Sequence, residues 1–97
     1  MILHILNRAP ASGPVASQAL MAMKDEDTLL LIEDAVLAIM FPDWEGWQQL
    51  EGRIYLLEED VRARGLENAV NHDACCCINV DAFVDLTERA TQSVSWF

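Results

Sequence analysis

Three cysteines stand side by side in the stretch NHDACCCINVDAF, and the chain contains no others. Adjacent thiols can bind a metal ion, carry sulfur as a persulfide, or serve as small apolar side chains. Three ligands must converge on one ion, whereas successive side chains of a strand point to opposite faces. Neither His4 nor His72 completes a zinc-binding spacing with Cys75–Cys77. We therefore expect no metal site in this run.

The remaining choice is between packing and sulfur chemistry. The stretch 74–79 is expected to form a covered strand, with Cys75 and Cys77 facing one helix layer and Cys76 facing the other. In such a strand cysteine packs as a small hydrophobe, and burial raises the pKa of its thiol. The alternative is a persulfide on Cys76 or Cys77. Cys77 is better placed for it, because open α/β sheets form their sites at the carboxyl ends of strands. We favour packing, because the acidic neighbourhood would disfavour a thiolate.

Acidic residues follow three of the expected strands: Glu33 and Asp34, then Glu58–Asp60, then Asp81 after Asn79. If they gather at one edge of a parallel sheet, they could bind a divalent cation or form a general acid/base pair. They could equally cap the helices that follow, where acidic side chains are favoured. No nucleophile–base pair and no glycine-rich phosphate loop accompanies them. We therefore expect capping, with no catalytic residue and no cofactor site.

Aromatic residues form a second group of interest. Trp44, Trp47, Trp96 and Phe97 lie outside the confidently expected strands. Tryptophan is enriched at the centres of protein interfaces, although these side chains could also cover the ends of the core. The hydrophobic fraction of 53% is high for a chain of 97 residues. Together these features predict an interface with a partner subunit.

The charge of the chain excludes several classes of partner. Sixteen acidic and six basic residues give a formal net charge of −10. A protein that binds a phosphate backbone or an anionic membrane needs the opposite sign, so direct nucleic-acid or membrane binding is not expected. The N-terminus shows no secretory signal, and no apolar run is long enough to span a bilayer. Because an odd cysteine count fits a reducing compartment, we expect a cytoplasmic protein.

The elements that would position these residues alternate along the chain. Strands are expected over 2–6, 28–33, 53–57 and 74–79, and 91–97 is a fifth strand or a docked segment. Helices are expected over 14–23, over 34–41 with Asp34 as N-cap, over 58–65 and over 80–90, with an irregular or short helical segment over 42–52. This alternation predicts a small three-layer α/β/α domain with a mainly parallel sheet, formed by residues 1–97 as one unit.

Five stretches of the chain together resemble a known family. They are LHILNRAP, DTLLLIEDAVLA, IYLLEEDVRARGL, INVDAFVDLT and the closing SVSWF. In this order and spacing they are similar to the TusB-like members of the DsrH family of sulfur-relay subunits, over essentially the whole chain. The resemblance implies a DsrE/DsrF/DsrH-type fold, with a parallel sheet between helices. The cysteine run falls where relatives place aliphatic strand residues, which agrees with packing.

The resemblance also implies partners. TusB-like chains assemble with TusC-like and TusD-like chains into a heterohexamer, a dimer of heterotrimers. That complex passes persulfide sulfur from TusA to TusE for 2-thiolation of the wobble uridine in certain tRNAs. The sulfur-carrying cysteine belongs to the TusD-like subunit, so the resemblance implies a structural subunit here rather than an enzyme.

Two local features bear on which branch of the family the chain resembles. DsrH proteins of sulfur oxidisers are also similar, and they can carry a cysteine in the first helix. The corresponding stretch here, PVASQALMAMK, has none, which favours the TusB-like branch. The family's usual Asp-Gly after the second strand is Asp34–Ala35 in this chain, so the backbone at that turn is expected to differ.

Overall fold

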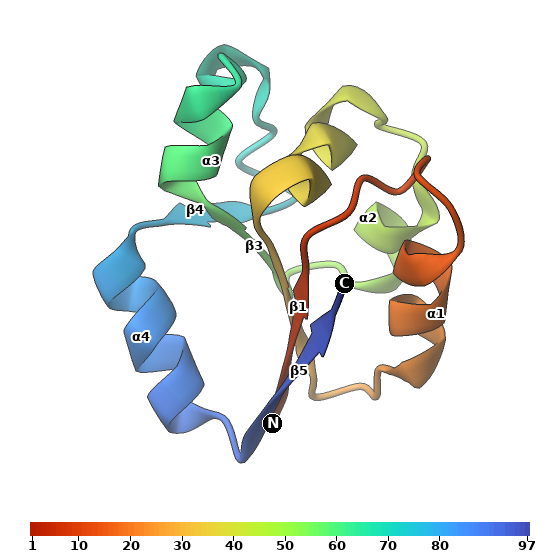
Figure 1. The fold of residues 1–97 in the computed structure, drawn as a ribbon, viewed down its shortest axis with the longest axis vertical. Helices are drawn as coiled ribbons and strands as arrows, with labels where there is room; N and C mark the ends of the chain where they lie inside the picture. Colours follow the sequence, from red (N-terminus) through yellow and green to blue (C-terminus); the bar gives the residue numbers. More distant parts are fainter.

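The computed structural model describes residues 1–97, which form one parallel sheet of five strands with helices against it (Figure 1). The strands are β1 (Ile2–Leu6), β2 (Thr28–Leu31), β3 (Ile54–Leu57), β4 (Cys76–Ile78) and β5 (Gln92–Trp96). Their order across the sheet is β4-β3-β2-β1-β5, and every neighbouring pair is parallel. The predicted α/β fold class is confirmed, and the C-terminal segment is a fifth strand.

The two strands at the centre of the sheet, β1 and β2, have no polar face. All four residues of β2 are buried, and so are four of the five residues of β1. A parallel strand that is covered on both sides needs apolar side chains at successive positions. The runs ILHIL and TLLL supply them, with His4 and Thr28 as the exceptions.

Most helices pack on one face of this sheet. Helical segments before β4 are α1 (Val15–Ala22), the 3₁₀ helix η1 (Glu33–Met40), α2 (Glu45–Gln49), α3 (Glu58–Ala63) and the 3₁₀ turn η2 (Glu67–Ala69). The larger apolar cluster contains Leu20 from α1, Val36 from η1 and Val61 from α3. None of the helices is long and apolar enough to cross a lipid bilayer.

The opposite face is covered by one helix, α4 (Val80–Arg89). Strands β1 to β4 are added in one direction across the sheet, whereas β5 lies beyond β1. Since crossovers between parallel strands are right-handed, this reversal places α4 on the other side from α1 and α2, as Figure 1 shows. Leu86 of α4 packs there against Leu3, Ile5 and Leu30 of the sheet. The three-layer arrangement follows from this reversal.

The segment expected as an α-helix over 34–41 is a 3₁₀ helix, and the expected N-cap was wrong. The Asp34 side chain makes no cap hydrogen bond; it accepts hydrogen bonds from Arg64 instead. The turn begins at Glu33, whose φ of +50° lies in the left-handed region that favours glycine. The backbone N–H of Glu33 donates to Asp60 Oδ2 at 2.7 Å, which ties this turn to α3. The helix ends at Met40, one residue before the expected end at residue 41.

The fourth strand is shorter than expected. It spans Cys76–Ile78 instead of 74–79, because the chain before it turns: the N–H groups of Ala74 and Cys75 both donate to the Asn71 carbonyl oxygen. This strand forms one edge of the sheet and pairs only with β3. Cys76 is therefore exposed, and the expectation that it would be covered by a second helix layer was wrong.

Candidate functional site

The three cysteines occupy three different environments. Cys75 is buried just before β4, Cys76 is exposed on the strand, and Cys77 is half-buried. Cys75 and Cys77 pack against the same apolar cluster, as the strand alternation predicts. Cys75 and Cys77 therefore pack against the core, as predicted. Cys76 is exposed at the β4 edge of the sheet, on the face that carries α4.

Burial makes the thiols of Cys75 and Cys77 weaker acids than an exposed cysteine. Burial is the main cause that raises the pKa of Cys75, to about 11, and the neighbouring thiols Cys77 and Cys76 add to it. Burial also raises the pKa of Cys77, with further contributions from Cys76 and Glu58. The Cys75 thiol donates to the Asn71 carbonyl oxygen at a sulfur–oxygen distance of 3.4 Å. Both groups remain thiols near neutral pH, so Cys77 is less suited to sulfur transfer than its place near the strand end suggested.

The acidic residues at the strand ends act mainly on the backbone and on arginines. Asp60 accepts the Glu33 N–H, as described above, and Asp34 Oδ1 lies 2.9 Å from Arg64 Nη2. Asn79 caps α4 by accepting the Ala82 N–H at 2.9 Å. No group of three or more His, Cys, Asp or Glu side chains is arranged to hold a metal ion. Asp34, Asp60 and Asn79 thus start or join helices, whereas Glu58, Glu59 and Asp81 line a shallow hollow at this edge.

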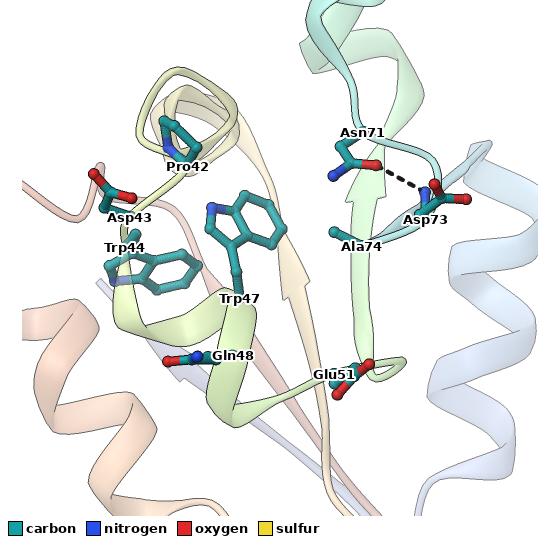
Figure 2. Close-up of a pocket in the computed structure, with 9 residues that line it drawn as sticks. All are labelled: Pro42, Asp43, Trp44, Trp47, Gln48, Glu51, Asn71, Asp73 and Ala74. Carbon is teal, nitrogen blue, oxygen red and sulfur yellow. Dashed lines mark hydrogen bonds between the residues drawn. The ribbon is translucent and has the colours of Figure 1, made fainter.

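Trp44 and Trp47 form one wall of an open hollow at the surface. Figure 2 shows them facing Asn71, Asp73 and Ala74 across a space of about 440 Å³. The two rings meet edge to face, with centroids 5.5 Å apart and planes at 86°. Both side chains are partly buried against the main core, so each combines a structural contact with an exposed face.

A second, more apolar hollow of about 320 Å³ adjoins the first and reaches the buried cysteine. The two hollows share Pro42, Trp47, Asn71 and Ala74, and Cys75 lines the inner one. Sequence reasoning singled out the tryptophans but not this neighbourhood. Asn71 and Asp73 lie in the loop before β4, whose position beside Trp47 depends on long-range pairing of β3 with β4.

Trp96, which we expected at an interface, makes a hydrogen bond within the chain. Its indole Nε1 donates to Nδ1 of His4 at 3.0 Å, and His4 Nε2 lies 3.1 Å from Asp27 Oδ2. His4 and Asp27 are 3% and 1% exposed, so this chain of contacts runs into the core. The polar His4 within the apolar run ILHIL was the only sequence signal for it. Phe97, the next residue, is 64% exposed and remains a candidate contact residue.

The carboxylate of Asp27 is the fixed end of this chain of contacts. Burial by itself raises the pKa of Asp27, but hydrogen bonds from the backbone N–H groups of Lys24 and Ile2 and from His4 outweigh it and leave the pKa lowered. Three donors thus hold the ionised form. The contacts bind the start of β1 to the loop before β2 and, through Trp96, to β5.

Large apolar side chains are exposed at several places. Met21 is 87% exposed, Met40 61% and Phe41 47%. Met40 and Phe41 line, together with Pro10 and Trp44, a shallow groove of about 490 Å³. The groove and the tryptophan hollow share Pro42, Asp43 and Trp44, and so they form one continuous surface. Exposed apolar surface of this kind is typical of a protein that binds another protein.

Comparison with solved structures agrees with this architecture. The crystal structure of the ychN protein from E. coli superimposes with a TM-score of 0.80 at 17% sequence identity, over 97% of each chain. The solution structure of protein Tm0979 from Thermotoga maritima gives a TM-score of 0.57 at 26% identity, over 91% of this chain and 92% of that one. The first likeness concerns the fold alone, because its sequence identity is low.

Comparison with known sequences gives the family. Protein TusB of Escherichia fergusonii is 33% identical over 101 aligned residues, which cover 98% of this chain and all of that protein. Protein TusB of Escherichia coli O81 is 32% identical over the same extent. The family described as "DsrH like protein" matches residues 9–93. With a full-length relative above 30% identity and a family match over most of its length, the chain belongs to the DsrH-like family.

Proposed function

We propose that this chain is a non-catalytic subunit of a sulfur-relay complex of the TusBCD type. In this proposal it assembles with TusC-like and TusD-like chains into a cytoplasmic heterohexamer. The complex takes persulfide sulfur from TusA and passes it to TusE, for 2-thiolation of the tRNA wobble uridine. The chain itself contacts protein partners and neither RNA nor membrane, in keeping with its net charge of −10.

The observation that carries this proposal is the full-length similarity to proteins named TusB, together with the family match over residues 9–93. The sulfur-relay role itself comes from the resemblance of the motifs, from LHILNRAP to SVSWF.

The chemistry of the cysteines supports a structural role. The first helix, α1, contains no cysteine. Cys75 and Cys77 are covered and have raised pKa values, so neither is prepared to attack a persulfide. Among the acidic side chains at the strand ends, Asp60 accepts the Glu33 N–H, and Asp34 and Glu58 pair with Arg64 and Arg62.

The exposed apolar surface supports the proposal that this chain is permanently bound to partner subunits. The groove with Met40 and Phe41, the exposed Phe97 and the two outer strands of the sheet are all free in the isolated chain. An outer strand presents unpaired N–H and C=O groups to any neighbour. A 97-residue protein that leaves this much apolar surface uncovered is better explained as one part of an assembly.

Co-expression tests the assembly. The chain is produced together with TusC-like and TusD-like proteins from the same source, with the tag on the TusD-like protein, and the eluate is separated by size exclusion. We expect all three chains to elute together at the size of a hexamer. If this chain elutes alone while the other two form a complex, the proposal is wrong.

A second candidate function rests on Cys76 alone. Its thiol is exposed, and so a persulfide on it could reach another protein. In that case the chain would be a sulfurtransferase that uses Cys76. The two candidates differ in one measurement: replacing Cys76 by serine stops sulfur transfer through a carrier and leaves transfer through a structural subunit unchanged.

A further inference from the structure

The hollow beside Trp44 and Trp47 has an unusual charge balance. Three carboxylates line it, from Asp43, Glu51 and Asp73, and no lysine, arginine or histidine does. None of the three forms an ion pair within the chain, although three arginine–carboxylate ion pairs occur elsewhere. The hollow therefore combines negative charge with aromatic faces and lacks an internal cation.

The aromatic wall is fixed before anything binds. The Trp44 ring lies against Gly46 so closely that a Cβ atom at position 46 would come within 2.6 Å of ring atoms Cζ2 and Cζ3. Only glycine permits this approach. Trp47 is held by its indole N–H, which donates to the Phe41 carbonyl oxygen at 3.0 Å. Two rings held in this way present the same faces with or without a ligand.

The opposite wall is also held in place. Asn71 Oδ1 accepts the backbone N–H of Asp73 at 3.0 Å, the contact drawn as a dashed line in Figure 2. This contact turns the loop so that Asp73 lies across the hollow from Trp47. The hollow thus has Trp44, Trp47 and Asp43 on one side and Asn71, Asp73 and Ala74 on the other, with Glu51 at its edge.

We propose that this hollow binds an arginine side chain presented by a partner protein. A guanidinium group stacks on aromatic faces and pairs with carboxylates through its planar fork of N–H donors, and the hollow offers both kinds of group. An anionic ligand would be repelled by the three exposed carboxylates, and an apolar one would gain no attraction from them. The proposal rests on the proposed function only for taking the partner to be a subunit or client of the complex.

Binding is tested on the full chain with two short peptides. The probe is acetyl-Gly-Arg-Gly-amide, and the control carries citrulline, which has the shape of arginine without its charge. The readout is the indole N–H signal of each tryptophan in a ¹⁵N spectrum. We expect the arginine peptide to shift the Trp44 and Trp47 signals in a saturable and salt-sensitive way. Trp96 is the internal control, because its indole is bound to His4.

Two outcomes with the arginine and citrulline peptides would overturn the arginine site. One is that citrulline and arginine peptides shift the signals equally, which would mean that the hollow binds apolar or neutral groups. The other is that arginine shifts no indole signal, or shifts all three alike as a non-specific effect of charge would. A lysine peptide that binds more tightly than the arginine peptide would also contradict the assignment.

Matched pairs of variants test whether the carboxylates of the hollow are the ones that bind arginine. Glu51 and Asp73 are exposed, so Glu51→Gln combined with Asp73→Asn should fold normally and weaken arginine binding about fivefold. The control removes the same charge elsewhere, through Asp85→Asn with Glu88→Gln on the exposed side of α4. Equal weakening by both pairs would show that only net charge matters and would overturn the site.

A third variant tests the aromatic wall with all charges retained. Gly46→Ala forces the Trp44 ring from its place, and we expect it to weaken arginine binding by a similar factor. Gln49→Ala, at an exposed position on the same short helix that does not line the hollow, is its control. The co-expression experiment remains independent. A chain that co-purifies with its partners yet shows no indole shift would overturn the arginine site alone, and a chain that binds arginine but never co-purifies would overturn the proposed function.

Discussion

The indole N–H of Trp96 donates to Nδ1 of His4 at 3.0 Å, and this contact joins the last strand to the first in the core. An indole nitrogen can only donate, so Nδ1 must accept and the hydrogen of the neutral imidazole lies on Nε2. Nε2 then donates to Asp27 Oδ2 at 3.1 Å. The C-terminal tryptophan therefore sets the tautomer of a buried histidine, which in turn supports a buried carboxylate.

Replacing Trp96 by phenylalanine removes the donor and retains an aromatic ring. We expect the free energy of unfolding to fall by about 1–3 kcal/mol, because Nδ1 of the buried His4 loses its partner. Urea denaturation followed by circular dichroism measures it. Phe97→Leu is the control at the next, exposed position and should change stability by less than about 0.5 kcal/mol. Equal effects of the two substitutions would rule out the hydrogen bond as the cause.

The carboxylate of Asp27 should govern acid stability. Its pKa is lowered in the folded chain, so its contribution to stability is complete above its ordinary pKa of 3.8 and is lost as the pH falls through the lower folded value. In Asp27→Asn we expect lower stability at neutral pH and a weaker dependence on pH below about 4. Thermal unfolding between pH 2 and 7 gives both. A variant that keeps the full acid dependence of the parent chain would contradict this role.

The cysteines should react in a fixed order. Because the pKa of Cys75 is raised to about 11 and its side chain is buried, we expect iodoacetamide at pH 8 to label Cys76 first, Cys77 more slowly and Cys75 only on unfolding. Peptide mass spectrometry after timed quenching measures the order. Rapid labelling of Cys76 follows from exposure alone and so does not identify a sulfur carrier. Early labelling of Cys75 would show that the inner hollow opens.

Glu33 occupies a backbone conformation that costs an ordinary residue about 1 kcal/mol. Replacing it by glycine should leave the free energy of unfolding unchanged or raise it by up to about 1 kcal/mol, because glycine adopts φ of +50° without strain. The Asp60 contact is kept, since it uses the backbone N–H. Glu59→Gly, within α3, is the control and should lower stability by about 1 kcal/mol. Equal losses in both would contradict backbone strain at Glu33.

Much of the fold could be predicted because the signals are local. Continuous apolar runs marked β1 and β2, and the turn-forming residues between them marked the crossovers. Asn79, which caps α4, and Pro42, which follows the end of η1 at Met40, also act on residues close to them in the sequence. Such features depend on neighbouring side chains and backbone groups alone, and so they can be read from one sequence.

The errors concern features that depend on distant contacts. Cys76 is exposed because β4 is an outer strand and a single helix lies on the second face of the sheet. The residues near Cys76 in the sequence do not determine the order of the strands. Asp34 fails to cap its helix because Arg64, thirty residues later, binds it. The hollow that joins Trp47 to Asn71 is likewise made by pairing of β3 with β4. At these positions the residue type drew attention to the side chain. The residues that it contacts in the folded chain could not be predicted from the sequence.

Sulfur transfer through the assembled complex tests the central claim most directly. Complexes are prepared with this chain in parent form and with Cys75, Cys76 and Cys77 all replaced by alanine, and radiolabelled sulfur is followed from TusA to TusE. We expect the same rate with both complexes, because this subunit supports its neighbours and carries no sulfur itself. Transfer that stops when the three thiols are removed, from a complex of unchanged size, would show that the chain is a carrier.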